Sequence, residues 1–166
     1  MQDLTKDQFY AGNVTRWHAH QSRKMRECGD NILDHQQRCF ELVMDFVLFP
    51  SNHLMWAVSY HDQAEVILGD MPFTAKRDWP ALAAAYERAD AEINDKYGVP
   101  QPANDYDRDV IKFVDRLDAY MMVAKHDPAL LTLDDWQDAK KDLQTRCASL
   151  DFDEELLKLK MKEPRT

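Results

Sequence analysis

The chain has 166 residues, and its 21 Lys and Arg stand against 30 Asp and Glu, which gives a formal net charge of −9 at pH 7. A surface with this excess of acid repels the phosphates of duplex nucleic acid, so a DNA- or RNA-binding module is not expected. Only 4 residues are Gly, which disfavours all-β folds and glycine-rich phosphate loops, whereas Leu, Ala, Glu and Lys favour helices. We therefore expect one all-α domain over residues 1–166.

Apolar residues recur at helical spacing in segments that Pro and Gly separate, which is typical of a helical bundle. A short helix is expected before Asp30, and the further predicted helices are Asp30–Phe49, His53–Leu68, Trp79–Tyr97, Asp105–Lys125, Leu133–Leu150 and Asp153–Lys160. The segments predicted as breaks or loops are Pro50–Asn52, Gly69–Asp78 and Gly98–Asn104.

The sequence predicts a soluble protein of the cytoplasm. Cys28, Cys39 and Cys147 are an odd number without CxxC spacing, which indicates reduced thiols. The N-terminus lacks the order of a signal peptide, and no apolar run approaches the ~20 residues that span a bilayer.

Ionisable side chains fall on the apolar faces of three predicted helices. His35 lies on the apolar stripe of the first long helix. In the next helix His61 lies on the apolar face, and Asp62 follows it around the helix, about 100° away. Asp115 lies on or beside the buried face of the helix Asp105–Lys125. Each of these side chains must find a partner in the interior.

Burying a carboxylate or an imidazole without a partner costs several kcal/mol. One histidine alone would be interpreted as a core residue bonded to a backbone carbonyl. His35, His61, Asp62 and Asp115 together are better explained by a shared divalent cation. Two imidazoles and two carboxylates suit Mn²⁺, Fe²⁺, Co²⁺, Ni²⁺ or Zn²⁺, and ligand type alone does not select among these ions.

The ordered blocks that carry these residues resemble the HD-domain metal-dependent phosphohydrolases. The blocks are Asp30 to His35, His61 to Glu65, Gly69 to Lys76 and Val114 to Tyr120. With Arg16-Trp17 upstream, the chain is similar to bacterial 5′-deoxynucleotidases and to the compact phage dATP triphosphohydrolases. The resemblance covers about residues 16–122 and implies an HD-domain helical bundle, with metal-site helices at about 30–125 and further helices at about 133–160.

The resemblance also implies a role for individual residues. His35, His61, Asp62 and Asp115 would be the ligands of one divalent metal, with Mg²⁺ as an additional ion on the substrate phosphates. Catalytic roles at the attacking water fall to Glu65 and Asp70, and substrate-binding roles to Arg16, Trp17 and Lys76. The alternatives are a surface ion pair for Glu65, a turn-shaping role for Asp70, core packing for Trp17, and ordinary solvated charges for Arg16 and Lys76.

The function that follows is hydrolysis of deoxynucleotides. The first expectation is a dATP or dNTP triphosphohydrolase that releases deoxynucleoside and tripolyphosphate. The alternatives are a deoxynucleoside 5′-monophosphatase and a catalytically silent HD-fold interaction module. The expected partner is the nucleotide, without a nucleic-acid duplex or a membrane. The resemblance further implies a homo-oligomer, a dimer or a hexamer, in the host cytoplasm if the protein is phage-encoded.

Overall fold

The structure is a computed structural model that describes residues 10–162. In this part of the chain the regular secondary structure is entirely helical, apart from an isolated antiparallel bridge between Thr15 and Asn31. The all-α prediction is therefore confirmed. The helices are α2 Arg23–Arg26, α3 Ile32–Phe46, α4 Asn52–Ser59, α5 Glu65–Leu68, α6 Phe73–Asp78, α7 Pro80–Tyr97, α8 Asp105–His126, the 3-10 helix η1 Pro128–Thr132, α9 Asp134–Ser149 and α10 Glu154–Lys162.

Local sequence explains the ends of the long helices. Pro80 occupies the first turn of α7, where its missing N–H costs no hydrogen bond, and Gly98 ends the helix in the left-handed conformation with φ of 64°. The side chain of Asn104 accepts a hydrogen bond from the Asp107 N–H and so caps the start of α8. These three helix ends lie within one residue of their predicted positions.

Three predicted elements differ in the structure. The helix predicted over Asp30–Phe49 is shorter, because α3 spans Ile32–Phe46. The helix predicted over His53–Leu68 ends at Ser59, and the chain runs through turns until α5 begins at Glu65. The loop predicted over Gly69–Asp78 contains α6, whose first backbone bonds run from Ala75 and Lys76 to the Pro72 carbonyl. Apolar periodicity does not register such interruptions, because the residues around a turn can keep the same inward side.

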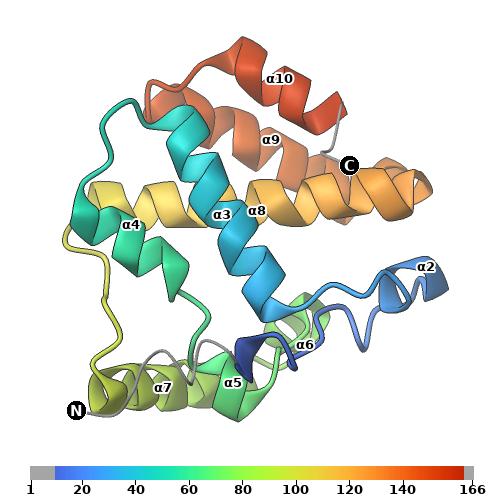
Figure 1. Cartoon of the computed structure of the whole chain (residues 1–166). Coiled ribbons are helices and arrows are strands. Elements are labelled where there is room, and N and C mark those ends of the chain that lie inside the picture. Colours follow the sequence, from blue (N-terminus) through green and yellow to red (C-terminus); the bar gives the residue numbers. More distant parts are fainter. Residues whose placement is uncertain (1–9, 163–166) are drawn as a thin grey trace. The chain divides into compact units, whose positions relative to one another are not determined.

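The chain divides into two compact units (Figure 1). The first comprises the described residues up to Gln37 together with Trp56–Gln101, and the second comprises Arg38–Met55 and the described residues from Pro102 onward. The chain passes from one unit to the other within α3, within α4 and after α7.

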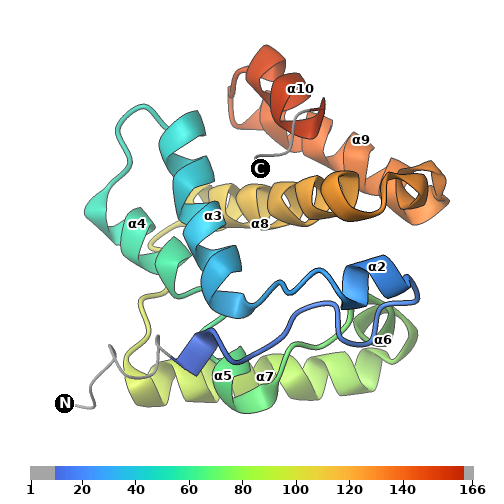
Figure 2. The same cartoon turned by 45° about the vertical axis from the view of Figure 1, so that its right-hand side comes forward.

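In the first unit, α5 and α6 pack against α7, and both ribbon views show these helices side by side (Figures 1 and 2). The fully buried apolar side chains of this unit include Met25 of α2, Ile32 of α3, Ala57 and Val58 of α4, and Ala64 in the turn after α4. Burial of such side chains removes apolar surface from water and holds the short elements in place.

In the second unit, α8 packs against α9, α10 and η1. The rings of Phe46, Phe113 and Phe152 meet edge-on or tilted, with centroids 5.1 to 5.5 Å apart. The carboxylate of Asp118 on α8 is almost fully buried and receives two hydrogen bonds from the Arg38 guanidinium, at 2.5 and 3.0 Å. This unit therefore has an apolar core and a buried ion pair of its own.

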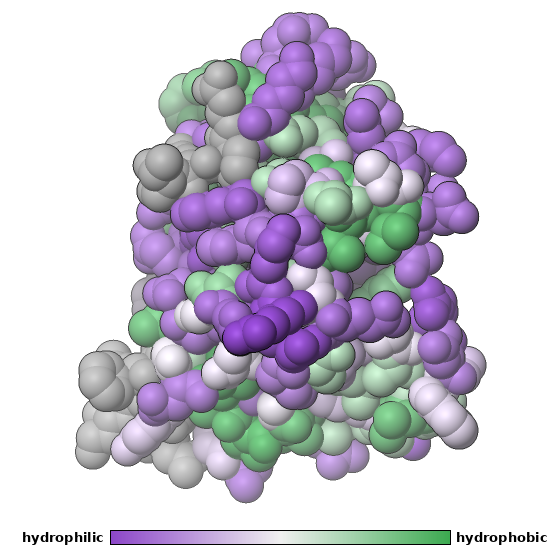
Figure 3. Space-filling model, turned by 90° about the vertical axis from the view of Figure 1, so that its right-hand side faces the viewer, coloured by the Kyte–Doolittle hydropathy of each residue, from purple (hydrophilic) through white to green (hydrophobic). Residues whose placement is uncertain are grey.

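Polar and charged side chains dominate the face in Figure 3, as the charged fraction of 31% leads one to expect, and apolar patches lie between them. Among the helices of residues 10–162, none combines the length and the apolar character needed to cross a bilayer.

Candidate metal centre

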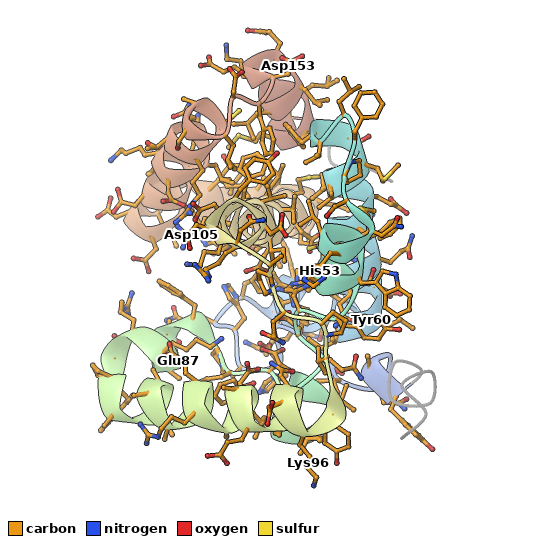
Figure 4. The ribbon with its side chains drawn as sticks, turned by 90° about the vertical axis from the view of Figure 1, so that its left-hand side faces the viewer. His53, Tyr60, Glu87, Lys96, Asp105 and Asp153 are labelled. Atoms are coloured by element: carbon orange, nitrogen blue, oxygen red, sulfur yellow. The ribbon has the colours of Figure 1, made fainter. Side chains whose placement is uncertain are left out.

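His61 and Asp62 lie in the turn that follows α4 rather than inside a helix. In a continuing helix the carbonyl of Val58 would accept the N–H of Asp62; here it receives the ring Nδ1 of His61 at 2.7 Å. Backbone bonds of the tighter i to i+3 type follow, from Gln63 to Tyr60 and from Glu65 to Asp62, both at 3.0 Å. Figure 4 labels Tyr60 at the start of this turn. The His61 side chain thus takes the place of the next backbone hydrogen bond of α4, and the same contact fixes the orientation of its ring.

Three donor atoms of the first unit converge. Nε2 of His35, on the first turn of α3, lies 3.1 Å from Nε2 of His61 and 3.3 Å from Oδ2 of Asp62. The His61 Nε2 lies 3.6 Å from the same Asp62 oxygen. His35 is fully buried, and the Asp62 side chain is 23% exposed. These side chains, called here the His35–His61–Asp62 cluster, are close enough together to hold a metal ion.

The donor chemistry of this cluster fits a divalent transition metal. Since the His61 Nδ1 faces a carbonyl, it carries the ring proton when the ring is neutral, and Nε2 keeps its lone pair toward His35. Adjacent ligands at about 2.1 Å from one ion lie about 3.0 to 3.4 Å apart in octahedral or tetrahedral geometry. The two Nε2 atoms are 3.1 Å apart. A proton shared between the rings is the alternative arrangement, and it needs no ion.

The electrostatic environment within the first unit shifts the pKa values of Asp62 and Glu65 in opposite directions. Burial alone would raise the pKa of Asp62, but the charge of His61 and the hydrogen bond and charge from His35 hold it well below the usual range. Glu65 begins α5 and is 6% exposed. Burial, reinforced by the carboxylates of Asp62 and Asp70, raises the pKa of Glu65 to about 9. One acid is therefore held as a carboxylate, and the other retains its proton near neutral pH.

The environment of Glu65 leaves part of its carboxyl group without a partner. Among the described residues, no group hydrogen-bonds its buried Oε2. A buried polar atom of this kind costs stability unless a ligand or water satisfies it, which is common at functional sites. Lys76 and Arg16 are the cations whose charge acts on Glu65 and lowers its pKa in opposition to burial. Glu65, with its predicted role at the attacking water, and the two predicted phosphate-binding cations are thus within electrostatic range of one another.

Asp115, the fourth predicted ligand, lies on α8 in the second unit and is partly exposed. Its role as a ligand stays a prediction.

Arg16 and Trp17 are held by Asp30, a residue that sequence reasoning gave no role of its own. The buried Asp30 Oδ2 accepts a hydrogen bond from the Trp17 indole N–H at 2.9 Å and lies 3.5 Å from an Arg16 guanidinium nitrogen. The Arg16 guanidinium lies 5.5 Å from the centroid of the Trp17 ring. Trp17 has a φ of 62°, a conformation that costs a non-glycine residue about 1 kcal/mol or more and persists only under restraint.

Asp70 lies near His18, and Lys76 lies near Tyr86 of α7. The His18 ring nitrogen lies 3.9 Å from Asp70 Oδ2. Tyr86 donates a hydrogen bond of 2.6 Å to the Gly69 carbonyl, and the Lys76 ammonium lies 5.4 Å from the centroid of the Tyr86 ring.

Sequence reasoning missed the contribution of α7, on which Figure 4 labels Glu87 and Lys96. Burial, then the charges of Glu65 and Asp62, raises the pKa of the Tyr86 hydroxyl above its usual value. Burial also raises the pKa of Asp90, with Asp62 acting in the same direction. Asp90 accepts a hydrogen bond of 2.9 Å from the buried Asn94. A signal for this face of α7 is present in the sequence: polar residues recur at every fourth position, Tyr86, Asp90 and Asn94.

No protein-family model matches the chain, and searches of curated proteins and of solved structures find no significant match either.

Proposed function

We propose that this protein is a metal-dependent phosphohydrolase of deoxynucleotides with an HD-type site. The single observation that carries the proposal is the convergence of His35 Nε2, His61 Nε2 and Asp62 Oδ2 within 3.1 to 3.6 Å, with the buried Glu65 starting the next helix. The substrate we propose is a deoxynucleoside triphosphate, dATP first, in the cytoplasm.

His35, His61 and Asp62 would hold the ion, with Asp115 proposed as the further ligand. A divalent ion of the Mn²⁺, Fe²⁺, Co²⁺, Ni²⁺ or Zn²⁺ type supplies activation of water and polarisation of a phosphoryl oxygen. Asp62 is suited to this role because its low pKa keeps it a carboxylate. His61 is suited because its Val58 contact fixes the ring orientation.

The other predicted site residues would act on the attacking water, on the phosphates of the substrate and on its base. Glu65 keeps its proton near neutral pH in the metal-free protein. Beside a bound cation its pKa would fall, and the carboxylate would then take the proton of the attacking water. The Arg16 guanidinium and the Lys76 ammonium would offset the negative charge that develops on the phosphate oxygens. Trp17, held by Asp30, would provide a flat surface for the base. We propose Asp70 as a second polar group at the water.

The proposed reaction is a single displacement at the phosphorus nearest the sugar. The water oxygen bonds to this phosphorus, and the bond from phosphorus to the 5′ oxygen breaks. The 5′ oxygen takes a proton, so the products are a deoxynucleoside and tripolyphosphate. The same displacement on a monophosphate would give a deoxynucleoside and orthophosphate.

The test is a product analysis with the purified protein. Each ribo- and deoxynucleotide is supplied as mono- and triphosphate with Mn²⁺, Co²⁺ or Mg²⁺, and His61→Ala is run in parallel. Tripolyphosphate that disappears in the variant supports the proposal. Orthophosphate from a monophosphate would replace it with a 5′-nucleotidase activity. A protein that binds metal but converts no nucleotide would indicate an HD-fold interaction module instead.

The proposed homo-oligomer, a dimer or a hexamer, is a separate matter from the chemistry. Sedimentation velocity at several protein concentrations measures it directly, and a species of monomer mass throughout would contradict it.

A further inference from the structure

Tyr86 of α7 contacts two segments that carry proposed site residues. Its hydroxyl donates to the Gly69 carbonyl at 2.6 Å, immediately before Asp70. Its ring lies under the Lys76 ammonium, 5.4 Å from centroid to nitrogen. The ring is half-buried and lies within range of the charges of Glu65, Asp62 and Asp70. One side chain therefore joins α7 to the turn after α5 and to α6.

We propose that Tyr86 is a positioning residue with two effects: its ring face holds the Lys76 ammonium and so increases the affinity of the site for a polyphosphate chain, and its hydroxyl fixes the Gly69–Asp70 turn and so supports turnover. This inference deepens the proposed function and rests on it for the substrate class.

The hydroxyl contact acts on a backbone segment with little freedom. Gly69 has φ of 77° and ψ of 154°, a region that is essentially restricted to glycine. Its N–H bonds to the Glu65 carbonyl at 2.8 Å, and its carbonyl accepts from Tyr86. Gly69 is thus held from both sides, and the direction in which the chain leaves toward Asp70 depends on the Tyr86 hydroxyl.

The ring contact acts on an exposed, flexible cation. Lys76 is exposed on α6, and its charge acts on Glu65 and Asp90. Attraction to the aromatic face restricts the ammonium to one region before an anion arrives. A cation that is already restricted loses less freedom when it binds phosphate, which increases affinity.

The experiment separates the two contacts. Tyr86→Phe removes the hydroxyl and keeps the ring, whereas Tyr86→Leu removes both. Binding of inorganic tripolyphosphate to the metal-treated protein is measured by calorimetry. We expect Tyr86→Phe to bind within about twofold of the wild type and Tyr86→Leu to bind about two- to fivefold more weakly, the range of an exposed cation–π contact. In turnover of dATP, Tyr86→Phe is expected to lower kcat with little change in KM.

A double-mutant cycle shows whether Lys76 mediates the effect of the ring. In a Lys76→Met background, Tyr86→Leu should weaken tripolyphosphate binding no further, since the cation that the ring positions is gone. Losses that add in full would overturn the proposal. A merely structural role of Tyr86 would give additive losses and a lower unfolding temperature in every variant.

The same helix offers a matched control. The Lys96 ammonium lies 5.2 Å from the centroid of the Tyr97 ring, which is another contact between a cation and an aromatic ring, in the last turn of α7. Tyr97→Leu and Lys96→Met should leave tripolyphosphate binding unchanged, and an equal loss there would contradict a specific role of Tyr86. If the wild type binds tripolyphosphate but hydrolyses no nucleotide, the proposed function fails, and the cycle still decides the role of Tyr86.

Discussion

Nε2 of His35 and Nε2 of His61 lie 3.1 Å apart, although the residues are 26 positions apart in the sequence. Two lone pairs at this separation repel each other unless a proton or a cation lies between them. The Asp62 carboxylate oxygen, 3.3 and 3.6 Å from the two nitrogens, adds a negative charge at the same point. The His35–His61–Asp62 cluster therefore favours a bound proton or metal cation. Which of the two it holds determines the chemistry of the site.

His61→Ala should abolish metal retention. It removes one of the converging nitrogens, and because loss of a group that merely supports a ligand costs about 10- to 100-fold in affinity, loss of a ligand should cost more than about 100-fold. Metal content after dialysis against Co²⁺ or Zn²⁺, measured by elemental analysis, checks this. His53→Ala is the control and should retain the metal, because His53, on α4 and labelled in Figure 4, is not one of the cluster residues. Full metal content in His61→Ala would exclude the cluster as the site.

Glu65→Gln should keep the metal and lose turnover. The amide has the size of the carboxyl group but cannot take a proton, so kcat should fall by about 100- to 10,000-fold if Glu65 is the general base. Steady-state kinetics with dATP and metal analysis of the same sample provide both readouts. An unchanged rate at saturating nucleotide would remove the role assigned to Glu65.

The stability of the metal-free protein should decrease with rising pH. The pKa of Glu65 is raised to about 9 in the folded protein. In the unfolded chain a Glu titrates near ~4.3. Between these values the unfolded chain has released a proton that the folded protein keeps, so folding becomes less favourable as pH rises. We expect Tm to fall by on the order of 5 °C between about pH 5 and pH 8.

Glu65→Gln is the matched control for this effect, because its amide does not titrate and its Tm should change less over the same interval. The depressed pKa of Asp62 acts in the opposite sense but only below about pH 4, where the unfolded side chain becomes protonated. Parallel Tm profiles for the wild type and the variant would contradict the assignment to Glu65.

Asp30→Asn should loosen Arg16 and Trp17. The buried carboxylate holds an indole N–H and a guanidinium, and hydrogen bonds to charged groups contribute about 1.5 to 3 kcal/mol. We expect the free energy of unfolding to decrease by about 2 kcal/mol and KM for dATP to increase. The control is Asp34→Asn, an exposed carboxylate bonded to Asn31, which should change stability by less than about 0.5 kcal/mol. Equal effects of the two variants would show that the Asp30 contacts contribute little.

Asp118→Ala should destabilise the second unit without affecting the metal centre. It leaves the Arg38 guanidinium without its buried carboxylate partner, a change that costs about 3 to 5 kcal/mol for a buried pair. Asp142→Ala breaks the more exposed pairs with Arg116 and Arg146 and should cost about 1 kcal/mol or less. Urea denaturation with metal analysis tests both, and loss of metal in Asp118→Ala would contradict a purely structural role.

The sequence by itself determined the helical class, most helix ends and the set of candidate ligands. Helix ends depend on capping residues and, in α7, on Pro80 and Gly98. These residues act on their nearest neighbours along the chain, so the helix ends can be predicted from local sequence. The apolar period marked His35 and His61 as inward-facing, because that period reports which side of an element is buried.

Tertiary structure decided what those residues contact. The turn at His61 depends on a side chain that takes a helix carbonyl, a choice that periodicity does not encode. Asp30 and Tyr86 acquire their roles through Trp17 and Gly69, which are 13 and 17 positions away in the chain. The raised pKa of Glu65 requires burial beside Asp62 and Asp70. Hydrogen bonds and desolvation at such sites depend on distances in space, and spacing along the chain does not specify them.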